Sequence, residues 1–334
     1  MSANTARTCR RSATGPGLRD EDKRVNIELF RHETILDQCA GLPPLPTAVV
    51  HPVQPAVLQA TADAVAAGLI VPVLVGPTAR IAEAAAHLDI SGWEIVDTEH
   101  SHAAAQTAAD MAAKGRVGAL MKGALHTDEL LGAVVRAESG LRTERRISHA
   151  YLMAIASYPK PFIITDAAVN IFPDLAAKAD IAQNAIDLWR VVFGSERLPK
   201  LAVLAAVETV NPKMTATLDA AALCKMADRG QIAGGLIDGP LAFDNAISAA
   251  AAADKGILSP VAGDADILLV PDIEAGNMLA KQLTFLGGAE AAGIVLGARV
   301  PIVLTSRADS VQTRLLSCAL AILLAEARKQ GLIK

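Results

Sequence analysis

The sequence predicts an α/β fold, because apolar runs typical of buried strands alternate with amphipathic helical patterns beyond residue 50. Hydrophobic residues make up 52% of the 334 residues, which is enough for a sizeable core, but aromatic residues make up only 3%. The core must therefore consist of alanine, valine, leucine and isoleucine, and such side chains favour close packing of helices on a sheet. We expect a largely parallel sheet with helices on its faces.

Eight apolar segments have the composition of buried strands. They are residues 70–75, 117–121, 162–165, 201–207, 235–237, 267–270, 294–296 and 300–305. Helical patterns separate most of them. They cover residues 79–88, a segment that begins near Thr127, residues 174–193, 215–229, 243–254, a segment that follows Asp272 and ends at 286, and residues 309–329. Thr127 and Asp309 stand where helix N-caps are expected, and Gly194 and Gly331 stand where helices end.

Nearly every predicted strand is followed by a polar residue. These residues are Lys122, Asp166, Glu208, Asp238, Asp272 and Ser306. Any one of them is more simply explained as an ordinary turn residue. In open α/β sheets, however, ligands bind beyond the carboxyl ends of the strands, so polar residues at six such ends predict a polar cleft.

The junction between the last predicted strand and the last helix favours anions. Ser306 and Arg307 lie where a strand meets a helix N-terminus, which presents unpaired N–H groups and the positive end of a dipole. The guanidinium of Arg307 adds forked donors suited to phosphate. An ordinary turn with a surface arginine is the alternative interpretation.

Charge, hydropathy and cysteine content exclude several classes of protein. The net charge of −4 gives no overall attraction to nucleic acid. No apolar stretch reaches the ~18 residues of a membrane span, so we expect no membrane association. The four cysteines show no C-x-x-C spacing and indicate reduced thiols of a cytoplasmic protein. Residues 1–25 contain Arg7, Arg10, Arg11, Arg19 and Arg24 but no secretory signal, so we expect a flexible arm.

Several common catalytic motifs are missing from the sequence. It has no dinucleotide fingerprint, no P-loop, no nucleophile elbow and no H-E-x-x-H. We therefore expect no metal site. Recognition of phosphate without a P-loop remains, which suits phosphoryl or acyl-phosphate chemistry, or binding of a nucleotide-tailed cofactor.

Ordered motifs over roughly residues 48 to 326 resemble the family of phosphate acetyltransferases and phosphate butyryltransferases. The motifs are 68–76, 120–123 with Thr127, Ser148-His149, 238–244, 262–266, Pro271-Asp272 with Gly276-Asn277, and 304–310. Residues 208–214, 217–221 and 225–231 look more like the butyryltransferase branch.

The resemblance implies an enzyme that transfers a short acyl group, acetyl or butyryl, between coenzyme A and phosphate. Acyl-CoA and inorganic phosphate would be its partners, with coenzyme A a substrate and no tightly bound cofactor. The family implies an isocitrate-dehydrogenase-like fold, with two α/β domains around a cleft, and a homodimer. Residues 26–160 plus 300–334 would form the first α/β domain and residues 161–299 the second.

The resemblance also assigns roles to individual residues. Arg307 would stabilise phosphate or the developing oxyanion, and Ser306 would hydrogen-bond the sulfur or the acyl oxygen. The acetyl branch has a carboxylate seven residues after this serine, where the present chain has Thr313. The proton acceptor is therefore open, with Asp309 and then Glu208 as the candidates.

A second group of residues is expected to bind substrate. These residues are Lys122, Thr127, Glu208, Asn211, Asp238, Asp272 and Asn277. Two alternative functions stay open at this point. Thr313 permits a non-catalytic protein that binds coenzyme A or acyl phosphate, and the fold group includes metal-dependent dehydrogenases. The absence of D-x-x-x-D spacing counts against a dehydrogenase.

Overall fold

A computed structural model of the chain describes residues 32–304 and 310–333. The strands, in chain order, are β1 (Leu45–Val50), β2 (Ile70–Gly76), β3 (Glu94–Asp97), β4 (Ala119–Lys122), β5 (Ser148–Ala154), β6 (Phe162–Thr165), β7 (Lys200–Leu204), β8 (Leu236–Leu241), β9 (Ile267–Leu269), β10 (Glu290–Leu296) and β11 (Ile302–Val303). They form one sheet with the order β3-β2-β1-β4-β11-β10-β5-β6-β9-β7-β8.

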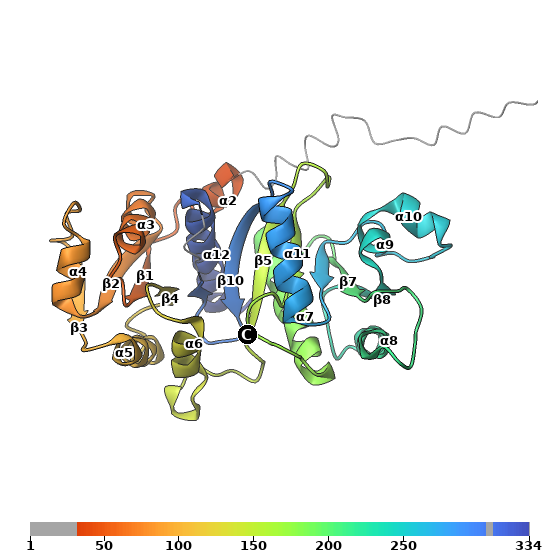
Figure 1. Cartoon of the computed structure of the whole chain (residues 1–334), viewed down its shortest axis with the longest axis horizontal. Helices are drawn as coiled ribbons and strands as arrows, with labels where there is room; N and C mark the ends of the chain where they lie inside the picture. Colours follow the sequence, from red (N-terminus) through yellow and green to blue (C-terminus); the bar gives the residue numbers. More distant parts are fainter. Residues whose placement is uncertain (1–31, 305–309, 334) are drawn as a thin grey trace, which may run out of the picture.

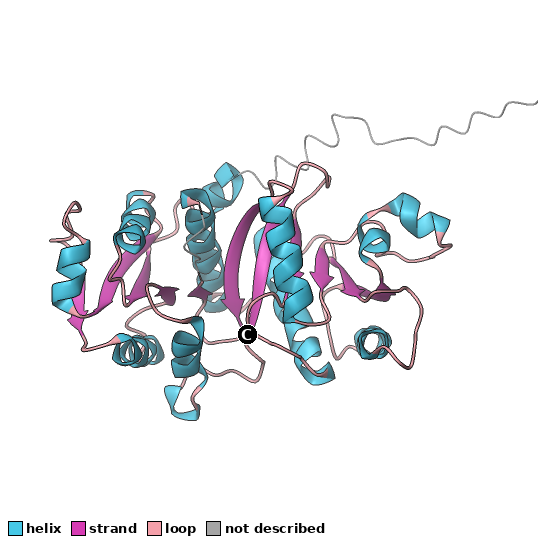
Figure 2. Cartoon of the chain, viewed as in Figure 1, coloured by secondary structure: helices cyan, strands magenta, loops and turns pink. Residues whose placement is uncertain are grey.

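Helices cover both faces of this sheet (Figure 2). They are α2 (His32–Gln38), α3 (Pro55–Ala66), α4 (Thr78–Ala84), α5 (Ser101–Ala113), α6 (Thr127–Val135), the 3₁₀ turn η1 (Ala137–Ser139), α7 (Leu175–Phe193), α8 (Thr215–Asp228), α9 (Phe243–Ile247), α10 (Ala249–Asp254), α11 (Ile273–Phe285) and α12 (Val311–Lys329). The α/β fold class is therefore confirmed, with a large and mostly parallel sheet.

The sheet consists of two parallel halves that run in opposite directions. Strands β1 to β4, β11 and β5 point one way, because β11 is parallel to β4 and both β11 and β5 are antiparallel to β10. Strands β6 to β9 follow the direction of β10, because β6 is antiparallel to β5. Both halves nevertheless end near the middle of the long central strands β5 and β10, so their carboxyl ends meet there.

The hydrophobic core is continuous on one face of the sheet and divided on the other. On the continuous face, α2, α3, α4, α7, α8 and α12 contribute to one cluster that spans both halves. Figure 1 shows α3 above the left half of the sheet and α8 below the right half. Because the sheet is twisted, the same face points up at the left of this view and down at the right. On the other face, α5 and α6 cover a first cluster, whereas α9 and α11 cover a separate second one.

Local signals explain where the long helices begin and end. Asp174 Oδ1 accepts a hydrogen bond from the Ala177 N–H (2.8 Å) at the start of α7, and Gly194 ends this helix with a positive φ of 84°. Both boundaries agree with the predicted segment 174–193.

Several predicted boundaries are wrong. The N-cap of α6 is His126 rather than Thr127, and the N-cap of α12 is Ser310, one residue after Asp309. The predicted helix 243–254 is divided into α9 and α10, because Ser248 has an extended backbone and its Oγ caps α10. The strands β1, β3 and β5 and the helices α2, α3 and α5 were not predicted.

Candidate functional site

A cavity of about 780 Å³ opens on the divided face of the sheet. Its lining residues come from both halves of the chain, and we call it the histidine cavity. They are His51, Arg80, Ser101, Lys122, Ala124, Leu125, His126, Thr127, Glu129, His149, Tyr151, Ala168 and Leu304. Leu304 packs against the first of the two separate clusters and Tyr151 against the second, so the cavity lies where the core is interrupted.

Strand register brings four of the central residues into one row across the sheet. Met121 pairs with Val303 and Gly293 pairs with Tyr151, so Lys122 on β4, Leu304 directly after β11, Gly293 on β10 and Tyr151 on β5 follow one another. At ~4.8 Å between neighbouring strands, Lys122 and Tyr151 lie about 14 Å apart along the row. The cavity is therefore elongated across the strand ends, as the sequence predicts for a ligand site of an open sheet.

His51 forms the wall of the cavity beyond the end of β1. It is buried, and its Nδ1 has no hydrogen-bond partner among the described residues. Its backbone has a positive φ of 56° and is held by hydrogen bonds with Val75 (2.7 Å) and Ala124 (3.0 Å). Burial and the nearby charge of Arg80 lower the pKa of His51, whereas Glu129 opposes this shift.

His149 forms the opposite wall, on the central strand β5. Only 1% of its surface is exposed, and burial lowers the pKa of its imidazole to about 3. The ring meets the ring of Tyr151 edge to face, with centroids 4.3 Å apart. Its Nδ1, like that of His51, lacks a hydrogen-bond partner within the described part of the chain. A neutral imidazole with an unused nitrogen therefore borders the cavity.

Basic side chains predominate at the β1–β4 end of this cavity. Arg80, Lys122 and His126 line it together with one carboxylate, Glu129. The hydrogen bond from Ser101 is the main cause of the lowered pKa of Glu129, which stays ionised. Two permanent cations face one anion, so this end of the cavity suits a negatively charged ligand.

A second cavity, of about 500 Å³, borders Tyr151 on its other side, and we call it the α11 cavity. Its lining is largely apolar. It consists of Tyr151, Asn277, Ala280, Lys281, Thr284, Phe285, Ala289, Glu290, Ala291, Ser310, Gln312, Thr313 and Leu316. The predicted residue Asn277 belongs here, and its Nδ2 donates to the Ala167 carbonyl (3.1 Å).

Of the residues expected to bind substrate, Lys122 and Thr127 line the histidine cavity. Four others lie outside both cavities and make local contacts. Glu208 pairs with Lys255 (3.0 Å), Asp272 caps α11, and the side chains of Asn211 and Asp238 accept hydrogen bonds from backbone N–H groups one or two residues later. The hydrogen bond from Lys255 is the main cause of a lowered pKa of Glu208, so this carboxylate is a weak proton acceptor.

The three residues expected to perform catalysis, Ser306, Arg307 and Asp309, lie outside the described residues. The described residues on either side of them are Leu304 and Ser310. Leu304 lines the histidine cavity and Ser310 lines the α11 cavity.

Comparison with known proteins agrees with this geometry. Residues 101–322 match the family described as "Phosphate acetyl/butaryl transferase". The chain belongs to this family. A phosphate acetyltransferase of Rickettsia prowazekii (strain Madrid E) is 58% identical over 289 residues, which cover 86% of this chain and 82% of the relative. A phosphate butyryltransferase of Clostridium acetobutylicum (strain ATCC 824) is 42% identical, over 80% of this chain and 89% of the relative.

A solved structure supports the same assignment. The crystal structure of a branched-chain phosphotransacylase from Enterococcus faecalis V583 has a TM-score of 0.72 and 31% identity, and covers 84% of this chain and 99% of that one. The family resemblance expected from the sequence is therefore confirmed. Of the two curated relatives, the acetyltransferase has the higher identity, although three motifs resemble the butyryl branch.

Sequence reasoning did not select several residues that border the histidine cavity of this family member. They are His51, Arg80, Ser101, His126, Glu129, His149, Tyr151 and Ala168. His51 directly follows β1, so recognition of that strand would have added it to the polar strand ends. His149 was part of a family motif but had no role, because nothing in its neighbourhood showed that β5 would border a cavity.

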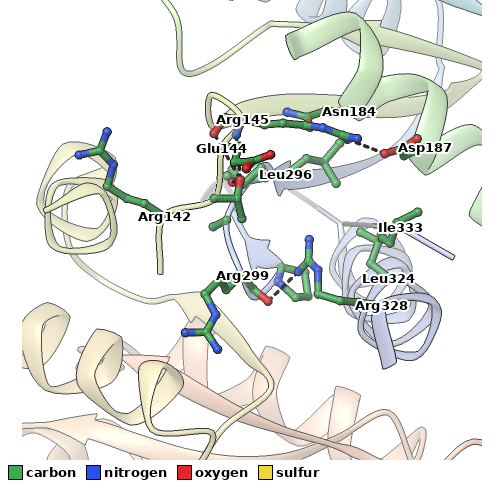
Figure 3. A pocket seen from close by; sticks show the side chains of 15 residues that line it. Arg142, Glu144, Arg145, Asn184, Asp187, Leu296, Arg299, Leu324, Arg328 and Ile333 are labelled. Carbon is green, nitrogen blue, oxygen red and sulfur yellow. Dashed lines mark hydrogen bonds and ion pairs between the residues drawn. The ribbon is translucent and has the colours of Figure 1, made fainter. Parts of the chain in front are cut away.

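A third cavity, of about 300 Å³, lies against α7 and α12 (Figure 3). Four arginines line it, namely Arg142, Arg145, Arg299 and Arg328. Arg145 pairs with Asp187 (2.5 Å), and Arg328 donates to the Arg299 carbonyl (2.7 Å). Burial, then the charges of Arg145 and Arg299, lower the pKa of Arg328. No residue predicted from the family resemblance borders this cavity, so we place the candidate site in the histidine cavity.

Neither metal ligation nor membrane insertion is indicated by residues 32–304 and 310–333. No cluster of three or more His, Cys, Asp or Glu side chains in these ranges could hold a metal ion. No helix in them combines the length and apolar character needed to cross a bilayer.

Proposed function

We propose that this chain transfers a short acyl group, acetyl or butyryl, between coenzyme A and inorganic phosphate, giving acyl phosphate and free thiol. The observation that carries the proposal is the 58% identity to a phosphate acetyltransferase over 86% of the chain. The elongated cavity supports it, because cations line one end and neutral groups the other. Coenzyme A is then a substrate, and no tightly bound cofactor is needed.

The reaction makes three demands on the protein. The thiol must lose a proton, since the thiolate is the nucleophile. Charge that develops on the carbonyl oxygen must be stabilised. Phosphate must be held against the carbonyl carbon, which is a task of positioning. Arg307 and Ser306 serve the second and third of these in our proposal, and Lys122 and Thr127 hold anionic groups of the substrates.

The position of the two cavities supports the roles of Ser306 and Arg307. Leu304 and Ser310 flank these residues in sequence, and each borders one of the two cavities that share Tyr151. Asn277 belongs to the same site through the α11 cavity. Glu208, Asn211, Asp238 and Asp272 remain candidates for substrate contacts, although each makes a local contact in the free protein.

Release of free thiol from acyl-CoA in the presence of phosphate tests this function. We expect purified protein to release thiol from acetyl-CoA or butyryl-CoA only when phosphate is present. Complete absence of such release with acyl chains of two to five carbons would reject the function. Calorimetric binding of coenzyme A without turnover would then indicate a binding protein, and metal-dependent NAD reduction by a hydroxy acid would indicate a dehydrogenase.

Replacement of Arg307 tests the proposed oxyanion contact. Arg307→Ala should lower kcat/KM by about 100-fold, as expected for loss of one charge-stabilising donor. Arg229→Ala is the matched control, because Arg229 is an exposed residue at the end of α8. If the Arg307 variant stayed within twofold of the wild type, Arg307 would have no part in the mechanism.

We also propose a cytoplasmic homodimer built from two α/β domains, residues 26–160 plus 300–334 and residues 161–299. Reduced thiols fit the cytoplasm, and the described cysteines Cys39, Cys224 and Cys318 are all free. Light scattering of the purified protein should give twice the mass of one chain.

A further inference from the structure

The proposed function leaves one step without a residue, the removal of the proton from the coenzyme A thiol. A free thiol has a pKa of about 8.5, so only a few per cent is ionised near pH 7. Thr313 stands where the acetyl branch has a carboxylate, Glu208 is paired with Lys255 outside the cavities, and the other candidate, Asp309, lies outside the described residues. We therefore examine the described groups that border the substrate cavity as proton acceptors.

His149 has the properties of such an acceptor. Its side chain is on the divided face of the sheet, where Ile147, directly before β5, belongs to the first hydrophobic cluster and Met153 on β5 belongs to the second. His149 thus occupies the interruption between the two clusters and borders the cavity. It lies two residues from Tyr151 on the same strand, and Tyr151 belongs to the row that includes Gly293 and Leu304.

The orientation of the His149 ring is fixed by its neighbours. A Cβ on Gly293 would lie 3.0 Å from His149 Nε2 and 3.1 Å from the Tyr151 ring, so the absence of a side chain at Gly293 makes room for both rings. The ring of Tyr151 also packs edge to face against that of His149. The imidazole is therefore held in place before any substrate arrives.

The unused nitrogen of this ring indicates a missing ligand. Nδ1 is buried and has no hydrogen-bond partner among the residues the structure describes. Leaving a buried polar atom unsatisfied costs about 1–3 kcal/mol, so such atoms are rare away from functional sites. A ligand that donates a hydrogen bond inside the cavity would satisfy it, and the coenzyme A thiol is such a donor.

We propose that His149 Nδ1 accepts the thiol proton of coenzyme A during acyl transfer. With acyl phosphate as donor, the S–H proton moves to Nδ1 while the sulfur attacks the carbonyl carbon. The C–S bond forms, the C–O bond to the phosphoryl group breaks with its electron pair going to phosphate, and the imidazolium passes its proton to the departing phosphate, which restores the neutral ring. In the opposite direction, phosphate gives its proton to Nδ1 as its oxygen attacks the thioester, the C–S bond breaks, and the imidazolium gives this proton to the sulfur.

The surroundings of His149 are compatible with both protonation states. Burial keeps the ring neutral before reaction, because it lowers the pKa far below neutrality. Negative charge on phosphate beside the new imidazolium raises this pKa in the complex. Two titratable groups lie next to His149: Tyr151 on β5 and Asp166 after β6, whose carboxylate accepts from the His149 N–H. The titratable or charged groups elsewhere around the cavity are Lys122, His51, Arg80, His126 and Glu129.

The variant His149→Asn separates proton transfer from packing. Its amide places a polar atom near the position of Nδ1 but takes up no proton at working pH. At pH 7 we expect kcat/KM for coenzyme A with acetyl phosphate to fall by about 100-fold or more. His87→Asn, at an exposed histidine just after α4, is the matched control and should keep wild-type activity.

The pH profile distinguishes a base from a structural residue. Without a base only the ionised thiol reacts, so the rate of the variant should rise about tenfold per pH unit from pH 6.5 towards the thiol pKa of about 8.5. The wild type should change by less than about threefold over this range. A variant whose activity falls by one constant factor at every pH would overturn the proposal.

A measurement on the wild-type protein covers the case in which the variant does not fold. The ¹⁵N resonance of His149 Nδ1 should move when coenzyme A binds and stay in place with desulfo-coenzyme A, which lacks the thiol. The same response to both ligands would contradict the contact. Thiol release by the wild type is measured in parallel, and its absence would reject the proposed function. If the wild type is active and the His149→Asn variant has the same kcat/KM, only the role of His149 is rejected.

Discussion

His51 and His149 show how strongly the cavity constrains its residues. The left-handed backbone of His51 disfavours a residue with a Cβ by about 1–2 kcal/mol, but its N–H donates to the Val75 carbonyl and its carbonyl accepts from the Ala124 N–H, which holds it in place. Both imidazoles are buried, and both have an Nδ1 that is unpartnered in the described structure. These positions are stabilised by their surroundings, and both buried nitrogen atoms belong to residues that line the cavity.

Acid should destabilise the protein through these histidines. The pKa of His149 falls from its ordinary value of 6.5 to about 3, so below pH 6.5 the unfolded chain binds a proton that the folded chain does not. Stability contributed by the neutral ring is present above pH 6.5 and is lost as the pH falls towards 3, about 2 kcal/mol of it by pH 5. Urea unfolding at pH 7.5 and pH 5 measures this loss.

The variant His149→Asn serves as the comparison in that measurement. It should lose about 2 kcal/mol less than the wild type between the two pH values, because asparagine does not titrate. His51, whose pKa is also lowered, and Asp166, whose pKa is raised by burial, contribute equally to both proteins. Equal acid sensitivity of the two proteins would show that His149 is protonated in the folded state.

The same residues explain what the sequence could predict about the site. Lys122 follows an apolar run directly, so the rule for strand ends found it, and the structure places it in the cavity. Glu208 and Asp272 satisfy the same rule but pair with Lys255 and cap α11. His149 lies inside a strand, and only the register of β5 against β10 shows that it borders a cavity. Residues within strands acquire such roles through distant packing, which local sequence does not encode.

At the scale of elements, close approach between the ends of β1 and β4 shapes the basic end of the cavity. The Gly123 N–H donates to the Val50 carbonyl (2.9 Å), and a Cβ on Gly123 would lie 2.3 Å from that oxygen and 2.8 Å from the His51 carbonyl. Only glycine permits the chain after β4 to pass beside His51. This packing holds Lys122 and His51 at neighbouring strand ends.

The substitution Gly123→Ala should therefore disturb both stability and substrate binding. The added methyl group meets backbone atoms that cannot rotate away, so β1 and β4 must separate, with a loss of about 1–3 kcal/mol. The KM for coenzyme A should rise, because Lys122 moves with its strand. Urea unfolding and steady-state kinetics measure the two effects.

Gly132→Ala provides the matched control for Gly123→Ala. Gly132 lies in the interior of α6, and a Cβ there would meet no atom within 4 Å. Alanine should stabilise this helix by about 0.5–1 kcal/mol and leave the kinetics unchanged. If both variants behaved alike, the close approach at Gly123 would have no special role.

At the scale of the whole molecule, the two faces of the sheet have different roles. The continuous cluster on one face joins the two halves of the chain through α7 and α12, whereas the divided clusters on the other face leave room for the histidine cavity. Alternation of strands and helices predicts the α/β class correctly. The antiparallel pairing at the centre was not predicted, because β5 was not recognised and only residues 294–296 of β10 were identified as a strand.

This arrangement predicts a single unfolding transition despite the proposed division into two α/β domains. The two halves share one hydrophobic cluster, so neither can unfold without exposing apolar surface of the other. Only Ala168 of the residues that line the cavity lies within residues 161–299, but because the two halves unfold together, coenzyme A at 100 times its Kd should stabilise the whole molecule by about 2.7 kcal/mol and raise the single Tm. Calorimetry with and without coenzyme A measures this. Two transitions, of which coenzyme A shifts only one, would instead mean that the halves are independent and that the ligand is held by a single half.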